Sequence, residues 1–309
     1  MKKYDPEAFT DVTFPAPLVP GDRIVILSPA GIIQPRLVEG AVRALENQGY
    51  YVEVSDHALG KSGTYSGTAQ ERLNDLEKAL LDPRVKAILC SRGGYGAVHL
   101  LQALDHLPLR DHPKWIIGFS DISALHALMT RHGIASIHGN MAKALAEGNP
   151  DNSLLYSILR GERPVYQFQP SEWDRPGVAS GKLVGGNLAV IAELIGTPFD
   201  VIQPGTILFI EDLEEPIYKI ERIMYQLRLS GAMEKLGGLI VGQFTEYKPN
   251  ANYSTVEDMI YDMTAGYDFP IAMNVPIGHV DHNIPVINSA RVTLKVSPAA
   301  LGNSLIFWK

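Results

Sequence analysis

The regular alternation of short apolar runs with helix-like segments is the sequence feature that most restricts how this chain can fold. Residues 22–31 are predicted to form a strand that ends in a turn of small residues, Ser-Pro-Ala-Gly. Residues 35–49 follow as a helix with one apolar face and a glycine at its C-terminal cap, and residues 50–54 form a second strand. Because a strand-helix-strand unit joins parallel strands, the pattern predicts an α/β fold built on a parallel sheet.

The alternation continues through the rest of the chain, with one interruption. Helices are predicted at residues 68–81, 98–104, 189–195 and 217–229, and strands at residues 85–90, 114–119, 134–140, 206–210, 238–243, 291–296 and 305–308. Periodicity weakens between residues 151 and 176, where prolines lie among polar residues, so a domain boundary is expected there. We predict an N-terminal domain over residues 1–165, which includes the N-terminal arm and the start of the linker, and a C-terminal domain over residues 166–309.

Composition and charge exclude several kinds of partner. With 46% hydrophobic and 20% charged residues, the chain is typical of a soluble globular protein. The formal net charge is −7 and no basic cluster could follow a phosphate backbone, so we expect no nucleic-acid partner. No apolar signal core follows the charged N-terminus, and no apolar run is long enough to span a bilayer. We therefore expect a cytoplasmic protein that does not bind membranes.

The sequence lacks the usual motifs for cofactors and metals. Its one cysteine, Cys90, lies inside an apolar run and is expected to be a small core residue, which excludes disulfides and cysteine-based metal sites. The turn after the first strand has none of the Gly-x-Gly-x-x-Gly spacing of dinucleotide-binding turns, and no Gly-x-x-x-x-Gly-Lys phosphate loop occurs. We therefore expect no cofactor and no metal ion.

The stretch from Trp115 to His126 combines a short strand, a sharp turn and a helix. An apolar run ends at the turn Gly118-Phe119-Ser120-Asp121, after which apolar residues recur at helical spacing. A serine at such a turn exposes its hydroxyl, and the first amides of the helix point at the group that the hydroxyl attacks, so Ser120 is a candidate nucleophile. Serine and aspartate are also ordinary helix caps, and from this stretch alone a cap is the favoured interpretation.

A glycine-rich loop, Ser91-Arg92-Gly93-Gly94-Tyr95-Gly96-Ala97, follows the strand predicted at residues 85–90. Three glycines within four residues let the backbone approach a ligand closely and present free N–H groups. Such a loop can bind a phosphate or donate a hydrogen bond to an oxyanion, and the alternative is a tight turn without a ligand. Arg92 could hold an anionic group or could be a solvated charge.

A serine nucleophile needs a base within hydrogen-bond reach and a third group that orients the base. The candidate bases are the loop histidines His138, His279 and His282, of which His279 lies in a rigid segment with prolines on both sides. Glu211 is the candidate orienting group because it comes directly after an apolar strand, where a carboxylate would face a cleft.

Other uses of these polar residues remain open. Asp212, Glu214 and Glu215 are expected to form an acidic N-terminus on the following helix, which the helix dipole favours. A binding module of the periplasmic type, with two α/β domains around a cleft, would need no catalytic residues, but it would need a signal peptide, which we do not expect here. A metallohydrolase would need three ligands and an open position, and no His-Glu-x-x-His helix occurs. Its ligands would come from Glu211, His279, Asp281 and His282.

Five segments together resemble the LD-carboxypeptidase family of serine peptidases, which includes the microcin C immunity proteins. They are the first strand and turn at residues 21–31, the glycine-rich loop at 91–96, the serine turn at 117–121, the acidic segment at 210–216 with 218–222, and residues 275–279. Each segment alone is a weak signal. Their occurrence in family order over nearly the whole chain after the first twenty residues is specific.

The resemblance implies a Ser-Glu-His triad, with Ser120 as the nucleophile, His279 as the general base and Glu211 as the orienting group. It also implies an oxyanion hole formed by the backbone N–H groups of Gly94 and Asp121. The implied fold has an N-terminal flavodoxin-like α/β domain that carries the serine. A smaller C-terminal α/β domain, swivelling and barrel-like, carries the glutamate and the histidine.

The family's usual reaction supplies the expected activity. The chain would release the terminal D-Ala from a murein tetrapeptide in cytoplasmic cell-wall recycling, through an acyl-enzyme, and would act as a homodimer on this small peptide. Arg92 would bind a substrate carboxylate. The alternative is a microcin-type hydrolase of acyl-sulfamoyl aminoacyl nucleotides. The tetrapeptide is favoured because no aromatic-rich insertion is present that would stack an adenine.

The chain departs from expected patterns at two points. Ser120 is followed by Asp-Ile rather than x-Gly, so the turn is not an α/β-hydrolase elbow. Asn288-Ser289 stands where a glycine-containing turn is expected, which affects the local loop and the choice of substrate but not the triad. His282 is the second candidate for the base.

Overall fold

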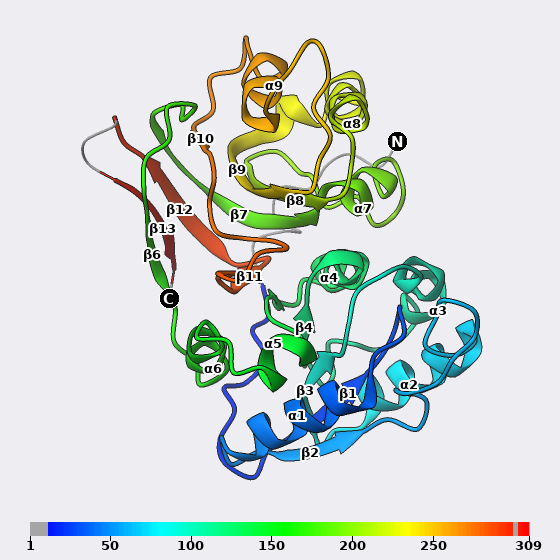
Figure 1. Cartoon of the computed structure of the whole chain (residues 1–309). Helices are drawn as coiled ribbons and strands as arrows, with labels where there is room; N and C mark the ends of the chain where they lie inside the picture. The colour runs from blue at the N-terminus through cyan, green and yellow to red at the C-terminus, as the bar shows by residue number, and fades with distance from the viewer. Residues whose placement is uncertain (1–11, 299–301, 309) are drawn as a thin grey trace.

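The computed structural model of the chain describes residues 12–298 and 302–308. It contains two sheets, one in the lower and one in the upper part of the molecule (Figure 1). The strands of the first sheet are β1 (Arg23–Leu27), β2 (Tyr51–Val54), β3 (Val85–Cys90), β4 (Trp115–Gly118), β5 (Ser136–His138) and β11 (Val286–Asn288). The helices of this part are α1 (Pro35–Glu46), α2 (Ala69–Leu81), α3 (Leu101–Leu104), α4 (Ser123–Arg131), α5 (Ala142–Ala146) and α6 (Asn152–Leu159).

The first sheet confirms the predicted parallel architecture. β1 to β5 pair in parallel in the order 2-1-3-4-5, which is the order of flavodoxin-like folds. β11 comes from near the C-terminus and pairs antiparallel with β5 at the edge. In an open sheet of this kind, the loops that bind ligands follow the carboxyl ends of the strands. Here these are the loops after β1, β3 and β4.

Helices cover both faces of the first sheet because successive strand residues point to opposite sides. Ile24 and Ile26 of β1 pack into the core that contains buried residues of α1, α5 and α6. Val25 and Leu27 face the other way and pack into the core that contains buried residues of α2, α3 and α4. The first strand is therefore buried on both faces, as its uninterrupted apolar run requires.

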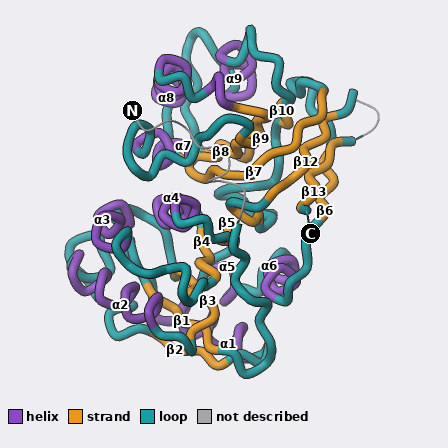
Figure 2. The backbone as a smooth tube through the Cα atoms, turned by 180° about the vertical axis from the view of Figure 1, so that it is seen from behind, coloured by secondary structure: helices purple, strands orange, loops and turns teal. Residues whose placement is uncertain are grey.

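The second sheet combines parallel and antiparallel strands. Its strands are β6 (Val165–Phe168), β7 (Gly177–Asn187), β8 (Thr206–Leu213), β9 (Leu236–Thr245), β10 (Ile271–Ala272), β12 (Arg291–Val296) and β13 (Asn303–Phe307), in the order β10-β9-β8-β7-β12-β13-β6. β7, β8, β9 and β10 run parallel, whereas β12, β13 and β6 pair antiparallel. Seen from behind, the helices gather at one side of this sheet (Figure 2). They are α7 (Leu188–Glu193), α8 (Ile217–Leu229) and α9 (Val256–Met263).

The glycine-rich segment before residue 188 is a strand that sequence periodicity did not predict. β7 spans Gly177–Asn187, and its glycines mark close approach of neighbouring groups rather than a turn. A Cβ atom at Gly185 would lie 1.8 Å from the carbonyl oxygen of Phe209 in β8, and one at Gly186 would lie 2.1 Å from Oγ of Ser123. The segment predicted as one helix at residues 98–104 is instead a 3-10 turn, Ala97–Leu100, followed by α3.

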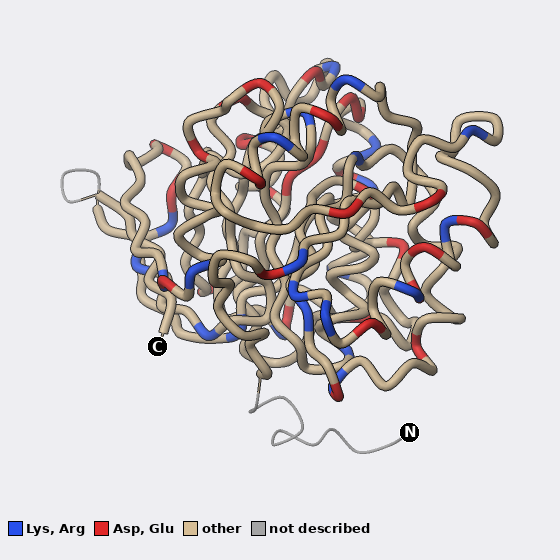
Figure 3. The backbone as a smooth tube through the Cα atoms, turned by 90° about the horizontal axis from the view of Figure 1, so that it is seen from below, with Lys and Arg blue, Asp and Glu red and all other residues tan. Residues whose placement is uncertain are grey.

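The two parts of the molecule meet where α4 lies against β7 and α7. Oγ of Ser123, the first residue of α4, accepts a hydrogen bond from the backbone N–H of Asn187 (2.9 Å). The hydroxyls of Thr130 and Ser289 lie 2.7 Å apart and are both buried. Acidic and basic positions are interspersed along the chain (Figure 3). In the part of the chain that the structure describes, no helix is long and apolar enough to cross a membrane.

Candidate active site

Ser120 lies at the end of β4 in a backbone conformation that non-glycine residues seldom adopt. Its φ is +65°, and the 3-10 turn Ser120–Ile122 begins here and leads into α4. The N-cap of this turn is Phe119, and no side chain caps it with a hydrogen bond, so the interpretation of Ser120 as a helix cap is wrong. A strained serine at a strand-to-helix turn, with its side chain partly exposed, is suited to present a nucleophile.

The side chain of Asp121 does not cap the helix either. Its Oδ2 accepts a hydrogen bond from the backbone N–H of Ala97 (2.8 Å), at the end of the glycine-rich loop. Burial raises the pKa of this carboxyl to about 6, and the N–H of Ala97 opposes the shift. The backbone N–H of Asp121 lies in the first turn, where amides have no acceptor within the helix. The residue therefore ties the serine turn to the loop and leaves its own amide available.

The glycine-rich loop after β3 is pressed against the serine turn. A Cβ atom at Gly93 would lie 2.7 Å from Cβ and 2.9 Å from Oγ of Ser120, so only glycine fits at this position. Gly94 has a φ of +105° and is exposed. The N–H of Gly31, in the turn after β1, donates to the carbonyl of Gly93 (2.9 Å). The loops after β1, β3 and β4 thus converge at the carboxyl end of the sheet.

Glu211, which is buried, and His279, which is partly exposed, form a pair from distant parts of the chain. Nδ1 of His279 lies 2.8 Å from Oε2 of Glu211, whose side chain is fully buried within β8 rather than just after it. Gly278 has a φ of +127°, and a Cβ atom there would lie 2.9 Å from both Cβ and Oε2 of Glu211. Glycine before the histidine therefore lets the imidazole approach the carboxylate.

The electrostatics of this pair favour a basic imidazole. Burial lowers the pKa of His279, but the hydrogen bond and the negative charge of Glu211 outweigh burial and raise it above the ordinary value. Burial raises the pKa of Glu211, and the hydrogen bond from His279 opposes that shift. Because Nδ1 is occupied by Glu211, Nε2 is the ring nitrogen that can accept a proton from another group.

An aromatic contact links the histidine to the serine turn. The rings of Phe119 and His279 lie 4.9 Å apart between centroids in an edge-to-face arrangement. Phe119 directly precedes Ser120, so the imidazole contacts the serine turn through its neighbouring residue. The structure in this way gathers the serine turn, the glycine-rich loop, Glu211 and His279 in one place.

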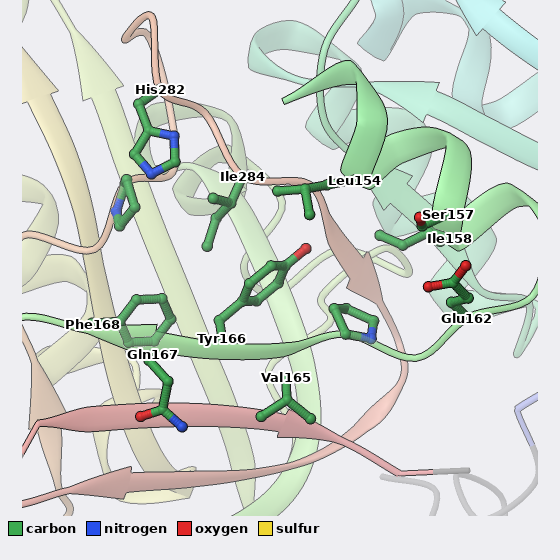
Figure 4. A pocket seen from close by; sticks show the side chains of 12 residues that line it. Leu154, Ser157, Ile158, Glu162, Val165, Tyr166, Gln167, Phe168, His282 and Ile284 are labelled. Carbon is green, nitrogen blue, oxygen red and sulfur yellow. The ribbon is translucent and has the colours of Figure 1, made fainter. Parts of the chain in front are cut away.

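The other candidate bases lie in different environments. His138 is fully buried between the rings of Phe119 and Phe209, at 5.7 and 5.1 Å between centroids, and burial holds its pKa well below the ordinary value. His282 lines a separate cavity of about 350 Å³ (Figure 4). Its Nδ1 lies 2.9 Å from Oδ2 of Asp151. The residues that line this cavity are Leu154, Ser157, Ile158, Glu162, Pro164, Val165, Tyr166, Gln167, Phe168, Pro276, His282 and Ile284.

The remaining predicted polar residues have separate partners. Arg92 is exposed, and its Nη1 donates to the carbonyl of Ile32 (2.7 Å) near the loop after β1. Asp212 accepts from Nδ2 of Asn187 (2.8 Å) and from the N–H of Ala189 (3.0 Å), so it stabilises the start of α7. The expected acidic first turn of α8 is wrong, because this helix begins after Pro216 and its first turn contains no acidic residue.

The surroundings of the histidines and of Cys90 decide between a metal site, a nucleophilic thiol and a structural role. Within residues 12–298 and 302–308, no three His, Cys, Asp or Glu side chains lie close enough together to hold a metal ion. His279 and His282 instead contact separate carboxylates, Glu211 and Asp151. Cys90 is fully buried, and burial raises the pKa of its thiol, so it is a core residue.

Comparison with known families matches both halves of the chain. Residues 24–139 match the LD-carboxypeptidase N-terminal domain, and residues 180–294 match the LD-carboxypeptidase C-terminal domain. The murein tetrapeptide carboxypeptidase of Pseudomonas aeruginosa is 33% identical over 277 residues, which cover 84% of this chain and 89% of that protein. The probable murein peptide carboxypeptidase of Bacillus subtilis (strain 168) is 31% identical over 292 residues, which cover 92% of each chain.

Solved structures share the same fold. The muramoyltetrapeptide carboxypeptidase of Oxalobacter formigenes superposes with a TM-score of 0.84 at 25% identity, over 93% of this chain and 99% of that one. An MccF-like protein of Bacillus anthracis gives a TM-score of 0.84 at 24% identity, over 96% of this chain and 100% of that one.

Proposed function

Because this chain belongs to the LD-carboxypeptidase family, and is therefore a serine-type LD-carboxypeptidase, we propose that it releases the terminal D-Ala from a murein tetrapeptide with Ser120, His279 and Glu211 as its catalytic triad. The observation that carries the proposal is the 2.8 Å contact between Nδ1 of His279 and the buried carboxylate of Glu211, beside the strained serine turn. A buried carboxylate fixes the imidazole tautomer that leaves Nε2 free to act as a base.

In the proposed reaction, Oγ of Ser120 attacks the carbonyl carbon of the scissile amide while Nε2 of His279 takes the hydroxyl proton. The carbonyl oxygen becomes an oxyanion, which the N–H groups of Gly94 and Asp121 stabilise. The C–N bond then breaks as His279 returns the proton to the amine of D-Ala. A water molecule, deprotonated by His279, hydrolyses the resulting ester and releases the tripeptide and free Ser120.

The left-handed conformation of Ser120 supports the nucleophile assignment. Such strain costs about 1–3 kcal/mol and persists where the surrounding structure enforces it, often at functional sites. The charge of Glu211 stabilises the imidazolium that forms when Ser120 loses its proton. We further propose that Arg92, on the exposed side of the glycine-rich loop, binds a substrate carboxylate. Replacing it with glutamine should raise KM for the tetrapeptide more than it lowers kcat.

The proposal places the enzyme in cytoplasmic murein recycling, as a homodimer. Fractionation of cells tests the compartment, and light scattering of the purified protein tests the dimer. The microcin-type reaction remains the second candidate, since MccF-like folds superpose well on this chain. At 24% identity that likeness establishes the fold only, whereas the 33% identical Pseudomonas relative is named as a tetrapeptide carboxypeptidase.

A turnover assay tests the proposal directly. Wild-type protein should release D-Ala from a murein tetrapeptide, and Ser120→Ala should abolish the release while circular dichroism and the melting temperature stay close to wild type. An acyl-sulfamoyl adenosine carrying an acidic aminoacyl group is the second substrate in the same assay. Preferential hydrolysis of that compound would replace the tetrapeptide by the microcin-type substrate, and D-Ala release by Ser120→Ala would refute the triad.

A further inference from the structure

One peptide bond of the glycine-rich loop is held from both sides by buried charged side chains. The carbonyl of Gly96 accepts a hydrogen bond from Nη1 of Arg72 (2.9 Å), and the N–H of Ala97 donates to Oδ2 of Asp121 (2.8 Å). Arg72 is 2% exposed and Asp121 is 4% exposed. Since Asp121 follows Ser120 directly, a continuous series of contacts joins Arg72 in α2 to the serine turn.

The same guanidinium also holds the turn after β1. Nη1 of Arg72 donates to the carbonyl of Pro29 at 2.6 Å, so one nitrogen joins the loops after β1 and β3. The same two loops are also joined by the N–H of Gly31, which donates to the carbonyl of Gly93 (2.9 Å). The two loops are therefore fastened at two points, one of which depends on the side chain of Arg72.

The groups around Arg72 hold its guanidinium in one orientation, and none of its described hydrogen bonds goes to a carboxylate. Its guanidinium lies over the ring of Tyr65, with Cζ 5.0 Å from the ring centroid, and Nη2 lies 3.3 Å from Nδ1 of His99. Burial lowers its pKa, and the charge of Asp121 opposes the shift. A buried guanidinium that donates mainly to backbone carbonyls orients the loops that carry them, because those carbonyls would otherwise lose their partner.

We propose that Arg72 is a positioning residue for the oxyanion hole, an inference that rests on the proposed function. By fixing the Gly96–Ala97 peptide, it sets the path of the loop so that Gly94 and Asp121 keep their N–H groups on the same carbonyl oxygen. The packing leaves little freedom, since a single added carbon at Gly93 would clash with Ser120. Misplacement by about 1 Å can cost roughly 100-fold in rate, and loss of one oxyanion donor about 100- to 1,000-fold.

Arg175 offers a matched control for a test with Arg72→Lys. Nη1 of Arg175 donates to the carbonyl of Tyr267 (2.7 Å), and Nη2 donates to the carbonyl of Thr264 (3.0 Å). Its guanidinium also lies near an aromatic ring, 5.8 Å from the centroid of Tyr261. Arg175 therefore also holds backbone carbonyls, but in the second part of the molecule and with a partly exposed side chain. Lysine keeps the positive charge at either position and loses the planar fork of donors.

The experiment compares kcat and KM for D-Ala release, the affinity of a peptide aldehyde that forms a tetrahedral adduct with the serine, and the melting temperature. Arg72→Lys should lower kcat about 10- to 100-fold, change KM less than about threefold, and weaken the aldehyde by a factor similar to the loss in kcat. Arg175→Lys should lower the melting temperature and leave both kinetic constants and the aldehyde affinity close to wild type.

Several results would overturn the inference. Arg72→Lys with kcat within about twofold of wild type, or with a change in KM alone, would show that Arg72 does not position the donors. If Arg72→Lys does not fold, Tyr65→Leu removes the ring under the guanidinium while keeping the arginine. It should lower kcat and weaken the aldehyde without raising KM, and unchanged values would contradict the inference. Wild-type protein that releases no D-Ala would instead refute the proposed function itself.

Discussion

At the scale of single residues, the pair of His279 and Glu211 makes the proposed activity depend on pH in a defined direction. The charge and the hydrogen bond of Glu211 raise the pKa of His279 above its ordinary value of 6.5, despite burial, which alone would lower it. A general base must be neutral, so activity should be lost as the pH falls through the raised pKa. The acid limb of kcat/KM for D-Ala release should therefore lie above pH 6.5.

Glu211→Gln is the control for this profile. Glutamine keeps the size of the side chain but removes the charge that raises the pKa, so the acid limb should move to lower pH. kcat should also fall by about 100- to 10,000-fold, because the imidazolium loses its stabilising partner. A wild-type limb at or below pH 6.5, or an unchanged limb in Glu211→Gln, would contradict the assignment of His279 as the base.

Gly93 provides a second prediction at this scale. A Cβ atom there would lie 2.7 Å from Cβ of Ser120, so Gly93→Ala must displace either the loop or the nucleophile. We expect kcat/KM to fall by about 100-fold or more, because displacement of this size misaligns the reacting atoms. Gly60→Ala is the control, as it adds the same methyl group to a loop elsewhere in the first part, where the nearest atom would be 3.0 Å away. Equal activity of the two variants would refute the close packing at Ser120.

The sequence identifies Ser120 and His279 as candidate site residues, but it does not predict which residues hold the surrounding loops in place. Ser120 and His279 stand out because glycines and prolines surround them, and these mark constrained loops. Arg72 gives no such signal, since an arginine in an amphipathic helix is normally solvated, and only the tertiary structure buries it. For Asp121 the sequence indicates only a helix cap, because the hydrogen bond that its carboxylate accepts depends on the position of Ala97.

At the scale of elements, the close contact of β7 with α4 positions the two parts that form the site. Gly186 in β7 has a φ of +146°, and a Cβ atom would lie 2.1 Å from Oγ of Ser123. Gly186→Ala should reduce the free energy of unfolding by about 2–4 kcal/mol, since overpacking adds to backbone strain. Denaturant unfolding measures the loss.

Gly196→Ala separates the two contributions to that loss. Gly196 also has a positive φ, +77°, but its added Cβ atom would have no neighbour within 4 Å. This variant should cost about 1 kcal/mol, from backbone strain alone. If Gly186→Ala costs no more than Gly196→Ala, the contact between β7 and α4 is looser than the structure indicates.

Elements with clear periodicity are those that the sequence predicts well. The first five parallel strands and the helices α1, α2 and α8 follow from apolar runs and helical spacing. The sequence does not predict β7, because glycine usually marks turns. Here the glycines let the backbone of β7 pack closely against β8 and α4. β8 extends through Glu211 to Leu213, since polar residues continue a strand when they find buried partners.

At the scale of the whole molecule, β11 binds the two halves together. It lies in the C-terminal half of the sequence but pairs antiparallel with β5 at the edge of the first sheet. We propose a domain boundary between residues 165 and 166, which falls after the first residue of β6. β11 crosses this boundary, because it follows the boundary in sequence and pairs with the first sheet. This return of the chain was not predicted, because a strand of three residues has too little periodicity to indicate its partner.

Because β11 joins the C-terminal half of the chain to the first sheet, we expect the two sheets to unfold together. Native-state hydrogen exchange should give the same opening free energy and the same denaturant dependence for core amides of β3 and β4 as for those of β8 and β9. Shared burial of β11 and of the hydroxyl pair of Thr130 and Ser289 supplies the physical link. A second sheet that opens at markedly lower free energy than the first would show that the halves are independently stable.

The most direct measurement of the central claim is covalent labelling by a peptidyl phosphonate that mimics the murein tripeptide and reacts with activated serines. Peptide mass spectrometry should locate one adduct per chain on Ser120, and Glu211→Gln and His279→Ala should each slow its formation at least about 100-fold. Labelling at another residue, or labelling of Ser120 at an unchanged rate in both variants, would contradict a triad of Ser120, His279 and Glu211.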